Sequence, residues 1–383
     1  MKIKFSLIMS LGSIIVILFF KACGSSDSGW GGRIEVRDGI TRVMNPPVPL
    51  YPEASLNLEQ DLVITGSEDH EPQMLQDIRT LDVDEDGNIY VLDEGAADIK
   101  AFDGGGRYLR TIGREGQGPG EFGLPVGIII TPRSEILVFD MGQRALKFLS
   151  LDGKFIRQLS TADKFQFTGP RFTPDGSMVG SYLMPADKPT AELKLFDPEL
   201  GPLRTIVSLP VTPPPVLHFF AARSMTGLRW NVNHRGEIIW GDFLRMEYAL
   251  HIHDQAGNHI RTLTREYDAL PITQNDKEAL LRLMFGEGPP PPQWDIRFPD
   301  QYPPFSGFSC DDGGRIYVKI HVKVGAEAGE HYDVFDSEGR YAARISLPVP
   351  LMVLKKGLLY TIAENEDGFR EVKRFKMNWE PRI

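Results

Sequence analysis

Between residues 80 and 377 the chain repeats one pattern of apolar and polar positions. Each unit has a short apolar strand, a turn with Asp or Gly, a second strand, and a third strand in which apolar and polar residues alternate. Such alternation is typical of a strand with two different faces. The six third strands are IKAFD (99–103), LKFLSLD (146–152), LKLFD (193–197), LHIHD (250–254), YDVFD (332–336) and VKRFK (372–376). Units of about 40–50 residues with four strands each predict an all-β fold, a six-bladed β-propeller of four-stranded antiparallel blades.

The two ends of the repeat region predict how the ring closes. The last unit, 351–377, lacks a fourth strand, and GRIEVRDGITRVMNP (32–46) has strands but no unit of its own. We expect 32–46 to join the last unit, because a free sheet edge is a liability. DLVITGS (61–67) then supplies the outer strand of that blade or a bridge into the first one.

One insertion, 265–305, breaks the period. Its first part, 272–288, has the pattern of a helix: Thr273 and Asp276 form a capping box, and an apolar stripe follows. The stripe consists of Leu280, Leu281, Leu283 and Met284. The sequence therefore predicts a short helix between two blades.

The second part of the insertion, PPPPQWDIRFPDQYPPF (289–305), is rich in proline and aromatic residues. Proline cannot donate to a sheet ladder, so we expect no ladder strand here and a segment lying across one face of the ring. It either covers an apolar patch or forms a lid or a partner-binding edge. In the second case Trp294 and Tyr302 are candidate ligand-binding aromatics.

The N-terminus has the pattern of an export signal. MKIK supplies positive charge, FSLIMSLGSIIVILFF (5–20) is an apolar run, and small residues follow. The sequence thus predicts a signal peptide over 1–22, a flexible tether over 23–32, and the propeller over 33–383.

The composition of this 383-residue chain limits the classes of partner that it can bind. Its formal net charge is −10, and removal of the leader would make it more acidic still. An acidic body disfavours nucleic acid and electrostatic docking on anionic lipid, since both need Lys and Arg. The two cysteines, Cys23 and Cys310, cannot build a disulfide framework, and Cys310 fits a small buried hydrophobe better than a nucleophile.

One join between units, RTIGREGQGPGEFGLPVGIIITP (110–132), carries a family resemblance. Its glycines, with Phe122 and Pro125, resemble the link of NHL-type repeats. Glycines let the chain cross from one blade's outer strand to the next blade's inner strand, Phe122 can plug the blade interface, and Pro125 fixes φ at strand entry. The resemblance implies the propeller architecture more strongly than any activity.

The leader resembles the lipobox of bacterial lipoproteins, in which cleavage leaves a lipid-bearing cysteine at the N-terminus. Cys23 follows Ala22 as in that family, whereas Phe20 and Lys21 depart from its usual residues. Gly24 after the cysteine implies, by resemblance to Gram-negative sorting, the outer membrane. With this leader the whole chain is similar to six-bladed β-propeller lipoproteins of Bacteroidetes-like bacteria. Cys23 is therefore the candidate lipidation site, and an uncleaved anchor or ordinary secretion is the alternative.

An acidic turn mimics a calcium loop. Asp82, Asp84 and Asp86 stand at calcium-loop spacing, with Asp93 in the last position. The flanks predict strands rather than helices, and the same turn recurs at 311–318 without the full acid set. We favour a hairpin turn and keep a Ca²⁺ site as the alternative.

Histidines give the other candidate metal ligands. His251 and His253 point to one face of a strand, and His321 and His331 can meet across a hairpin. Amidating lyases of the NHL class bind metal through histidines from different blades, and gluconolactonase-like propellers use carboxylates and Asn. This chain reproduces neither set, so we expect no cofactor, with Zn²⁺ or Ca²⁺ as the alternative.

Three arginines are the remaining candidates. Arg79, Arg171 and Arg229 lie just before or within inner strands, which line the channel of a propeller. If they converge at its mouth, they make a pocket for a carboxylate or an acidic sugar. Otherwise each pairs with a neighbouring Asp or Glu.

Two functions from different classes follow. The first is a monomeric cell-envelope lipoprotein that acts as a binding or scaffold propeller for a protein, peptide or glycan ligand. The second is a channel-centred lyase or hydrolase, with or without a divalent metal. An enzyme needs several His, Asp or Glu side chains converging in the channel with perturbed pKa values, whereas a scaffold needs an exposed aromatic patch on the insertion.

Overall fold

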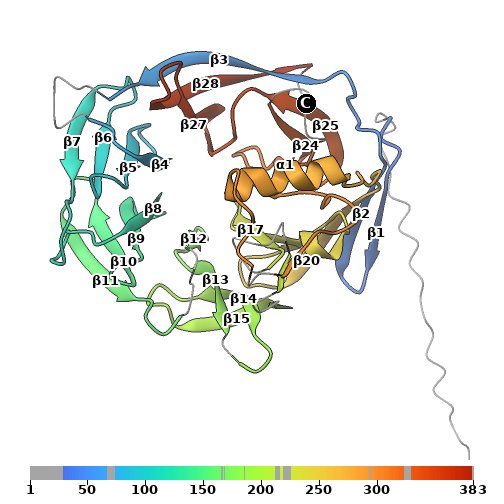
Figure 1. The fold of residues 1–383 in the computed structure, drawn as a ribbon, viewed down its shortest axis with the longest axis horizontal. Helices are drawn as coiled ribbons and strands as arrows, with labels where there is room; N and C mark the ends of the chain where they lie inside the picture. Colours follow the sequence, from blue (N-terminus) through green and yellow to red (C-terminus); the bar gives the residue numbers. More distant parts are fainter. Residues whose placement is uncertain are drawn as a thin grey trace, which may run out of the picture.

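The protein is an all-β, six-bladed propeller, seen down its ring in the computed structural model of Figure 1. The structure describes residues 29–66, 74–164, 167, 169–184, 186–211, 216–218, 226–292, 295–322 and 329–381. The predicted leader and Cys23 lie outside these residues, as does Trp294. No helix within the described ranges is long and apolar enough to cross a membrane.

Each blade is a four-stranded antiparallel sheet. From the inner strand outward, blade 1 holds β4 (Ile78–Val83), β5 (Ile89–Asp93), β6 (Asp98–Phe102) and β7 (Tyr108–Ile112), and blade 2 holds β8 (Pro125–Ile130), β9 (Glu135–Asp140), β10 (Ala145–Ser150) and β11 (Phe155–Ser160). Blade 3 holds β12 (Arg171–Phe172), β13 (Met178–Met184), β14 (Thr190–Phe196) and β15 (Pro202–Pro210), and blade 4 holds β17 (Leu228–Val232), β18 (Ile238–Asp242), β19 (Ala249–His253) and β20 (His259–Arg265). Blade 5 holds β22 (Gly307–Cys310), β23 (Ile316–Lys319), β24 (Glu330–Phe335) and β25 (Tyr341–Leu347), and blade 6 holds β26 (Val353–Lys355), β27 (Leu358–Glu364), β28 (Arg370–Glu380) and β3 (Ser55–Ile64).

Side chains packed between neighbouring blades form the core. Phe122, in the glycine-rich join, is fully buried among residues of blades 1 and 2, which confirms its predicted place at a blade interface. Gly113 has φ 78°, and a Cβ there would lie 2.2 Å from the Phe122 ring. The join therefore needs glycine at this position both for its backbone conformation and for its close contact.

The hairpin turns share one hydrogen-bond scheme. In the turn of blade 1, the Asp84 Oδ1 accepts hydrogen bonds from the backbone N–H of Asp86 at 2.9 Å and of Asn88 at 2.8 Å. Asp103 makes the corresponding pair of bonds in the next turn. Short polar side chains favour such turns because they satisfy backbone donors locally. The repeated Asp-Gly pattern is thus a signature of the hairpins.

The ring closes through β3, which pairs antiparallel with β28 from Val372↔Ile64 to Glu380↔Ser55. The expectation that 61–67 supplies the outer strand of the closing blade is confirmed in part, since β3 begins earlier, at Ser55, and ends at Ile64. Blade 6 thereby joins strands from the two ends of the described chain (Figure 1).

The expectation that 32–46 joins the last unit is wrong. This segment forms the hairpin β1 (Arg33–Arg37) and β2 (Ile40–Asn45), and β2 pairs parallel with β20 of blade 4. The Asn45 side chain explains why the hairpin packs against blade 4. Its Nδ2 donates to the carbonyls of Thr264 and Gly339, and its Oδ1 accepts from the Tyr341 N–H at 2.6 Å. These bonds fix the hairpin at the seam between blades 4 and 5.

The insertion joins β20 to β22. Its helix, α1 (Gln274–Phe285), begins with the predicted capping box between Thr273 and Asp276, so the predicted helix is confirmed. The apolar stripe is only partly covered, since Leu280 and Leu281 are half-buried and Leu283 is 85% exposed, and Asp276 is the buried residue of α1. In Figure 1 the helix overlies the inner side of the ring, between β17 and β24.

The expectation of no ladder strand in the proline-rich segment is also wrong. β21 (Asp295–Arg297) pairs parallel with β16 (Val216–His218). The physical reason is local. These three residues lie between prolines and contain none, so their backbone N–H groups remain available for a short ladder.

Candidate functional site

The inner strands β4, β8, β12 and β17 lie around the centre of the ring in Figure 1, and β22 and β26 hold the same place in the strand order of blades 5 and 6. They all run in the same direction, because each blade repeats one strand order. The turns between first and second strands therefore gather on one face of the ring, here called the turn face. The connections between blades, including the insertion, gather on the other, the insertion face.

Asp82 lies on β4, two residues before the turn that begins at Asp84. Its Oδ2 accepts from the Ile130 N–H of blade 2 at 2.7 Å, and its Oδ1 accepts from the Val83 N–H at 2.8 Å. Burial raises the pKa of the Asp82 carboxyl, while these N–H groups and the cations of Lys355 and Arg171 oppose the rise. The calcium-loop residue is thus a channel carboxylate that ties two blades together.

Arg171 and Asn231 hold the equivalent position, two residues before the turn, on β12 and β17. Arg171 is exposed to solvent. Desolvation by the surrounding ring nevertheless lowers the pKa of its guanidinium, and the Asp82 charge opposes this fall. Asn231 repeats the Asp82 geometry, since its Oδ1 accepts from the next N–H, that of Val232, at 2.9 Å. One layer of the channel therefore carries an acid, a cation and an amide.

Arg229 lies one layer further from the turn face. Its Nε donates to the Ser306 carbonyl at 2.8 Å, and its guanidinium lies 4.6 Å from the centre of the Phe243 ring. Burial lowers the pKa of this guanidinium. Gly127 and Gly307 hold the same layer on β8 and β22, and a Cβ on either would meet no atom within 4 Å. The strands thus leave space at the level of Arg229.

The insertion brings Tyr302 to this level. Tyr302 is buried, and its ring centre lies 5.6 Å from that of His321, which follows β23. Burial raises the pKa of Tyr302 to about 12, helped by Asp276, and burial lowers the pKa of His321 to about 4, helped by Lys319 and Arg229. Tyr302 and His321 are therefore both uncharged near neutral pH.

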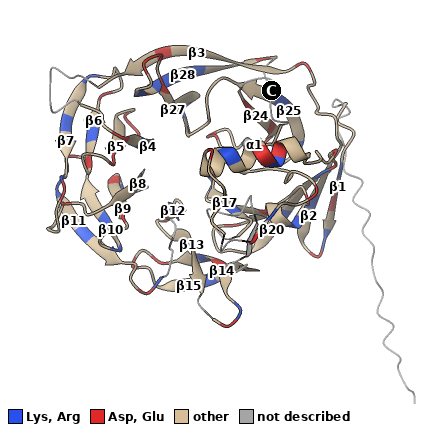
Figure 2. Cartoon of the chain, viewed as in Figure 1, with Lys and Arg blue, Asp and Glu red and all other residues tan. Residues whose placement is uncertain are grey.

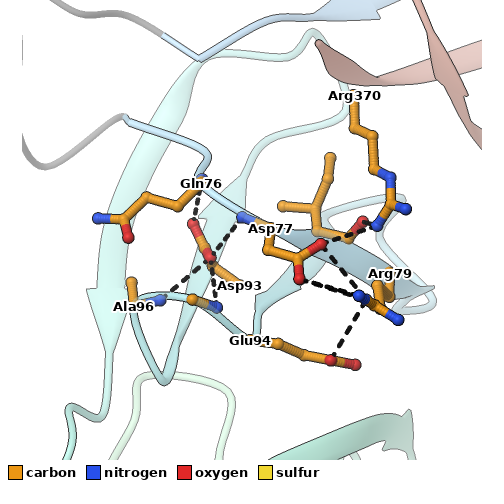
Figure 3. A network of polar contacts seen from close by, with 9 residues as sticks. Gln76, Asp77, Arg79, Asp93, Glu94, Ala96 and Arg370 are labelled. Carbon is orange, nitrogen blue, oxygen red and sulfur yellow. Dashed lines mark hydrogen bonds and ion pairs between the residues drawn. The ribbon is translucent and has the colours of Figure 1, made fainter. Parts of the chain in front are cut away.

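Arg79 belongs to a separate network on the insertion face (Figure 3). It pairs with Asp77 at 3.1 Å and with Glu94 at 3.4 Å, and Arg370 of blade 6 pairs with Asp77 at 2.8 Å. The hydrogen bond from Arg79 lowers the pKa of Asp77, and burial raises the pKa of Glu94. Arg79 thus follows the alternative interpretation, pairing with neighbouring acids, and the convergence of the three arginines stays a prediction.

The predicted metal candidates have protein partners. The Asp84 carboxylate also accepts from the Asn88 Nδ2 and from the Tyr90 hydroxyl. His251 stacks on Trp240 with ring centres 4.3 Å apart, and His253 stacks on His259 at 4.9 Å. Both His251 and His253 lie on β19, the third strand of blade 4, rather than on an inner strand. Within the described part of the chain, no group of three or more His, Cys, Asp or Glu is arranged to hold a metal ion.

Sequence reasoning missed Asn231 and Lys355 as neighbours of the channel, and it considered His321 only as a candidate metal ligand. Asn231 was detectable, because counting two residues back from each hairpin turn gives Asp82, Arg171 and Asn231. His321 had no such signal, since its contact with Tyr302 depends on where the insertion folds back.

Comparison with known proteins supports the architecture. A family described as a 6-bladed beta-propeller matches residues 68–170, roughly the first two blades. A protein of Bacteroides fragilis NCTC 9343 described as exported is similar over 88% of this chain and 99% of its own, at 9% identity and a TM-score of 0.53. None of the curated proteins compared with the chain matches it.

Two further solved structures show weaker similarity. A member of the DUF4221 family from Bacteroides vulgatus ATCC 8482 aligns over 85% of this chain and 98% of its own, at 13% identity and a TM-score of 0.48. The virginiamycin B lyase of Staphylococcus aureus aligns over 84% and 99%, at 12% identity and a TM-score of 0.40. At these identities the shared feature is the fold, and the chain is a β-propeller similar to a Bacteroides protein described as exported.

Proposed function

We propose that this protein is an exported binding propeller of the cell envelope, which takes an acidic group of a peptide or glycan ligand in its central channel. The observation that carries this proposal is the layer of Arg229 beside Gly127 and Gly307. There the Arg229 guanidinium, which donates to the Ser306 and Leu228 carbonyls, shares its layer with two glycines on which a Cβ would meet no atom within 4 Å. A guanidinium in such surroundings favours a carboxylate, because charge-assisted hydrogen bonds are the strong ones.

The electrostatics of the channel support an anionic group. Arg171 lies one layer closer to the turn face than Arg229. Desolvation lowers the pKa of both guanidiniums, so a negative charge placed nearby would stabilise either cation. Tyr302 and His321 add hydrogen-bonding groups without charge. Over the whole ring the two signs of charge are interspersed (Figure 2), so attraction of an anion has to come from this local arrangement.

A titration with paired probes tests the channel. We expect a peptide with a free C-terminal carboxylate, or an oligogalacturonate, to bind more tightly than the amidated peptide or a neutral oligosaccharide, by about tenfold or more. Arg229→Met should remove this preference. The matched control is Arg37→Met on β1, outside the ring, which should bind as the wild type does. Equal affinity for charged and neutral probes in the wild-type protein would refute the proposal.

The export and anchoring part of the proposal comes from the leader. The structural similarity to a protein described as exported is consistent with it. Metabolic labelling with a palmitate analogue should mark the wild-type protein and leave Cys23→Ser unlabelled, whereas Cys310→Ser should label normally. Labelling of Cys23→Ser would rule out the anchor.

A channel-centred enzyme is the second candidate, and Asp82 favours it. A carboxyl with a raised pKa that faces a channel is a possible general acid. Tyr302 and His321 do not help, since the pKa of each lies far from neutral. Turnover of a glycan or lactone substrate that Asp82→Asn abolishes and Arg229→Met only weakens would establish this alternative.

A further inference from the structure

A second site lies on the turn face, away from the channel layers. Between blades 5 and 6 the surface encloses a cavity of about 240 Å³. Its lining combines apolar side chains with charged ones: Leu354, Leu358, Met377 and Trp379 with Asp311, Asp312, Arg315 and Lys355. This volume is below the roughly 300–1,000 Å³ of pockets for drug-sized ligands, so it suits a single small ring.

The cavity exists because β28 is longer than its inner neighbour. The pairing of β28 with β27 ends at Lys376, whereas its pairing with β3 continues through Trp379↔Leu56 to Glu380↔Ser55. This two-stranded overhang carries the Trp379 ring from blade 6 toward blade 5. The ring centre lies 6.4 Å from that of Tyr317 and 5.8 Å from the Arg315 guanidinium.

Trp379 is held in place by a short polar network. Its ring lies beside that of Tyr317, and the Tyr317 hydroxyl donates to Asp311 Oδ2 at 2.9 Å. Arg315 closes the network, since its Nη1 lies 3.3 Å from the same oxygen. The indole is therefore a preorganised platform, and little side-chain entropy is lost when a ligand contacts it.

The charges of the lining select the class of ligand. Two carboxylates and two cations balance, so a ligand of either sign meets like charge as well as opposite charge. The Asp312 carboxylate accepts from the Lys356 N–H at 2.7 Å at the cavity edge, which leaves acceptor and donor groups side by side. A neutral pyranose matches this surface, because its hydroxyls both donate and accept and its C–H face packs on an aromatic ring.

We propose that this cavity is a carbohydrate subsite that stacks one neutral pyranose ring on Trp379. Asp312 and Arg315 then hydrogen-bond the ring hydroxyls. The cavity shares Lys355 with the surroundings of Asp82 but is not lined by Arg229, so a glycan could engage the turn face whether or not an acidic group enters from the insertion face.

Saturation-transfer NMR and calorimetry with four methyl glycosides, of glucose, galactose, mannose and N-acetylglucosamine, test the subsite. We expect at least one to bind with a Kd on the order of 1–10 mM, as befits one small ring. Trp379→Ala should weaken binding at least about tenfold, Trp379→Phe should retain part of it, and Asp312→Asn should weaken it. Phe369→Ala, an exposed aromatic on the opposite face of the same blade, should bind as the wild type does.

Three results would overturn the assignment. They are no binding of any of the four glycosides to the wild-type protein, unchanged binding by Trp379→Ala, or a preference for glucuronate, glucosamine or a dipeptide amide over the neutral sugars. Arg229→Met should leave glycoside binding unchanged, so that failure here and failure of the channel proposal are distinguishable. The Trp379→Phe variant controls for misfolding of Trp379→Ala, because it keeps an aromatic ring in the overhang.

Discussion

At the scale of single residues, Asp333 is a buried charge with four polar side-chain partners. Its carboxylate is fully buried and accepts from the hydroxyls of Tyr248 at 3.0 Å and Tyr341 at 2.8 Å. It also pairs with Arg344 at 2.8 Å and with the buried Arg265 at 3.2 Å. These partners come from blades 4 and 5, so one carboxylate joins two blades.

Removal of that charge should be costly. We expect Asp333→Asn to lower the free energy of unfolding by about 3–5 kcal/mol, because the buried Arg265 keeps its charge without a counterion. Urea unfolding measures the change. Asp38→Asn, at an exposed acid, should alter stability by less than about 0.5 kcal/mol. A loss below about 1 kcal/mol at Asp333 would contradict this view of the cluster.

The stacked histidines of blade 4 give the protein an acid-sensitive point. Burial lowers the pKa of His251 to about 4, and it also lowers the pKa of His253 and His259. The unfolded chain therefore binds these protons near pH 6.5 while the folded chain does not. The free energy of unfolding therefore stays at its higher value above about pH 6.5 and decreases as the pH falls toward 4.

The variant His251→Phe keeps a ring against Trp240 but cannot titrate. Between pH 7 and pH 4 the wild type should lose about 2 kcal/mol more stability than this variant, as followed by thermal or urea unfolding at several pH values. Parallel pH profiles for the two proteins would show that His251 does not contribute. Carboxylates that titrate in the same range affect both proteins alike.

At the scale of elements, α1 stands out because none of its apolar residues is fully buried and Leu283 is exposed, while its capping box is intact. The helix is thus held by its N-terminus and by Asp276 rather than by a hydrophobic face. Thr273→Ala should cost about 1 kcal/mol within the helix. Amide exchange over 274–285 should become faster while the global Tm stays the same, and Leu283→Ser should change neither. A fall in global Tm would show that α1 is part of the cooperative core.

The elements also show where the sequence was informative. Alternating strands and a capping box are local patterns, so the third strands and α1 could be predicted. Pairing partners are not local. The local pattern of 33–45 predicts strands whichever blade the hairpin packs against. Its position is fixed by hydrogen bonds from Asn45 to Thr264 and Gly339, which lie far along the chain.

The same contrast holds for the candidate sites. Arg171 and Arg229 were predicted because inner strands line the channel. Asp82 was considered only as a ligand of the alternative Ca²⁺ site, because a hairpin turn and an ion loop place acids at the same spacing. The Trp379 platform had no local signal, since it depends on how far β28 extends beyond β27.

At the scale of the whole molecule, blade 6 is complete only when β3 pairs with β28. A chain that begins at residue 39 lacks β1 alone and should remain folded, because β2 and β3 are intact. A chain that begins at residue 67 lacks β1, β2 and β3 and should lose cooperative unfolding, because β28 becomes a free edge and Leu56 and Ile64 leave the core. Circular dichroism melts and limited proteolysis compare the two. Equal melts would mean that closure is dispensable.

The position of the β1–β2 hairpin decides how the ring bears a mechanical load. A pull on the N-terminus reaches β1 first, then the β2–β20 pairing and the Asn45 bonds at blades 4 and 5. It reaches β3, the strand that seals the ring, only after those contacts have yielded. The hairpin and its contacts with blades 4 and 5 therefore bear tension applied at the N-terminus before that tension reaches the β3–β28 pairing that closes the ring.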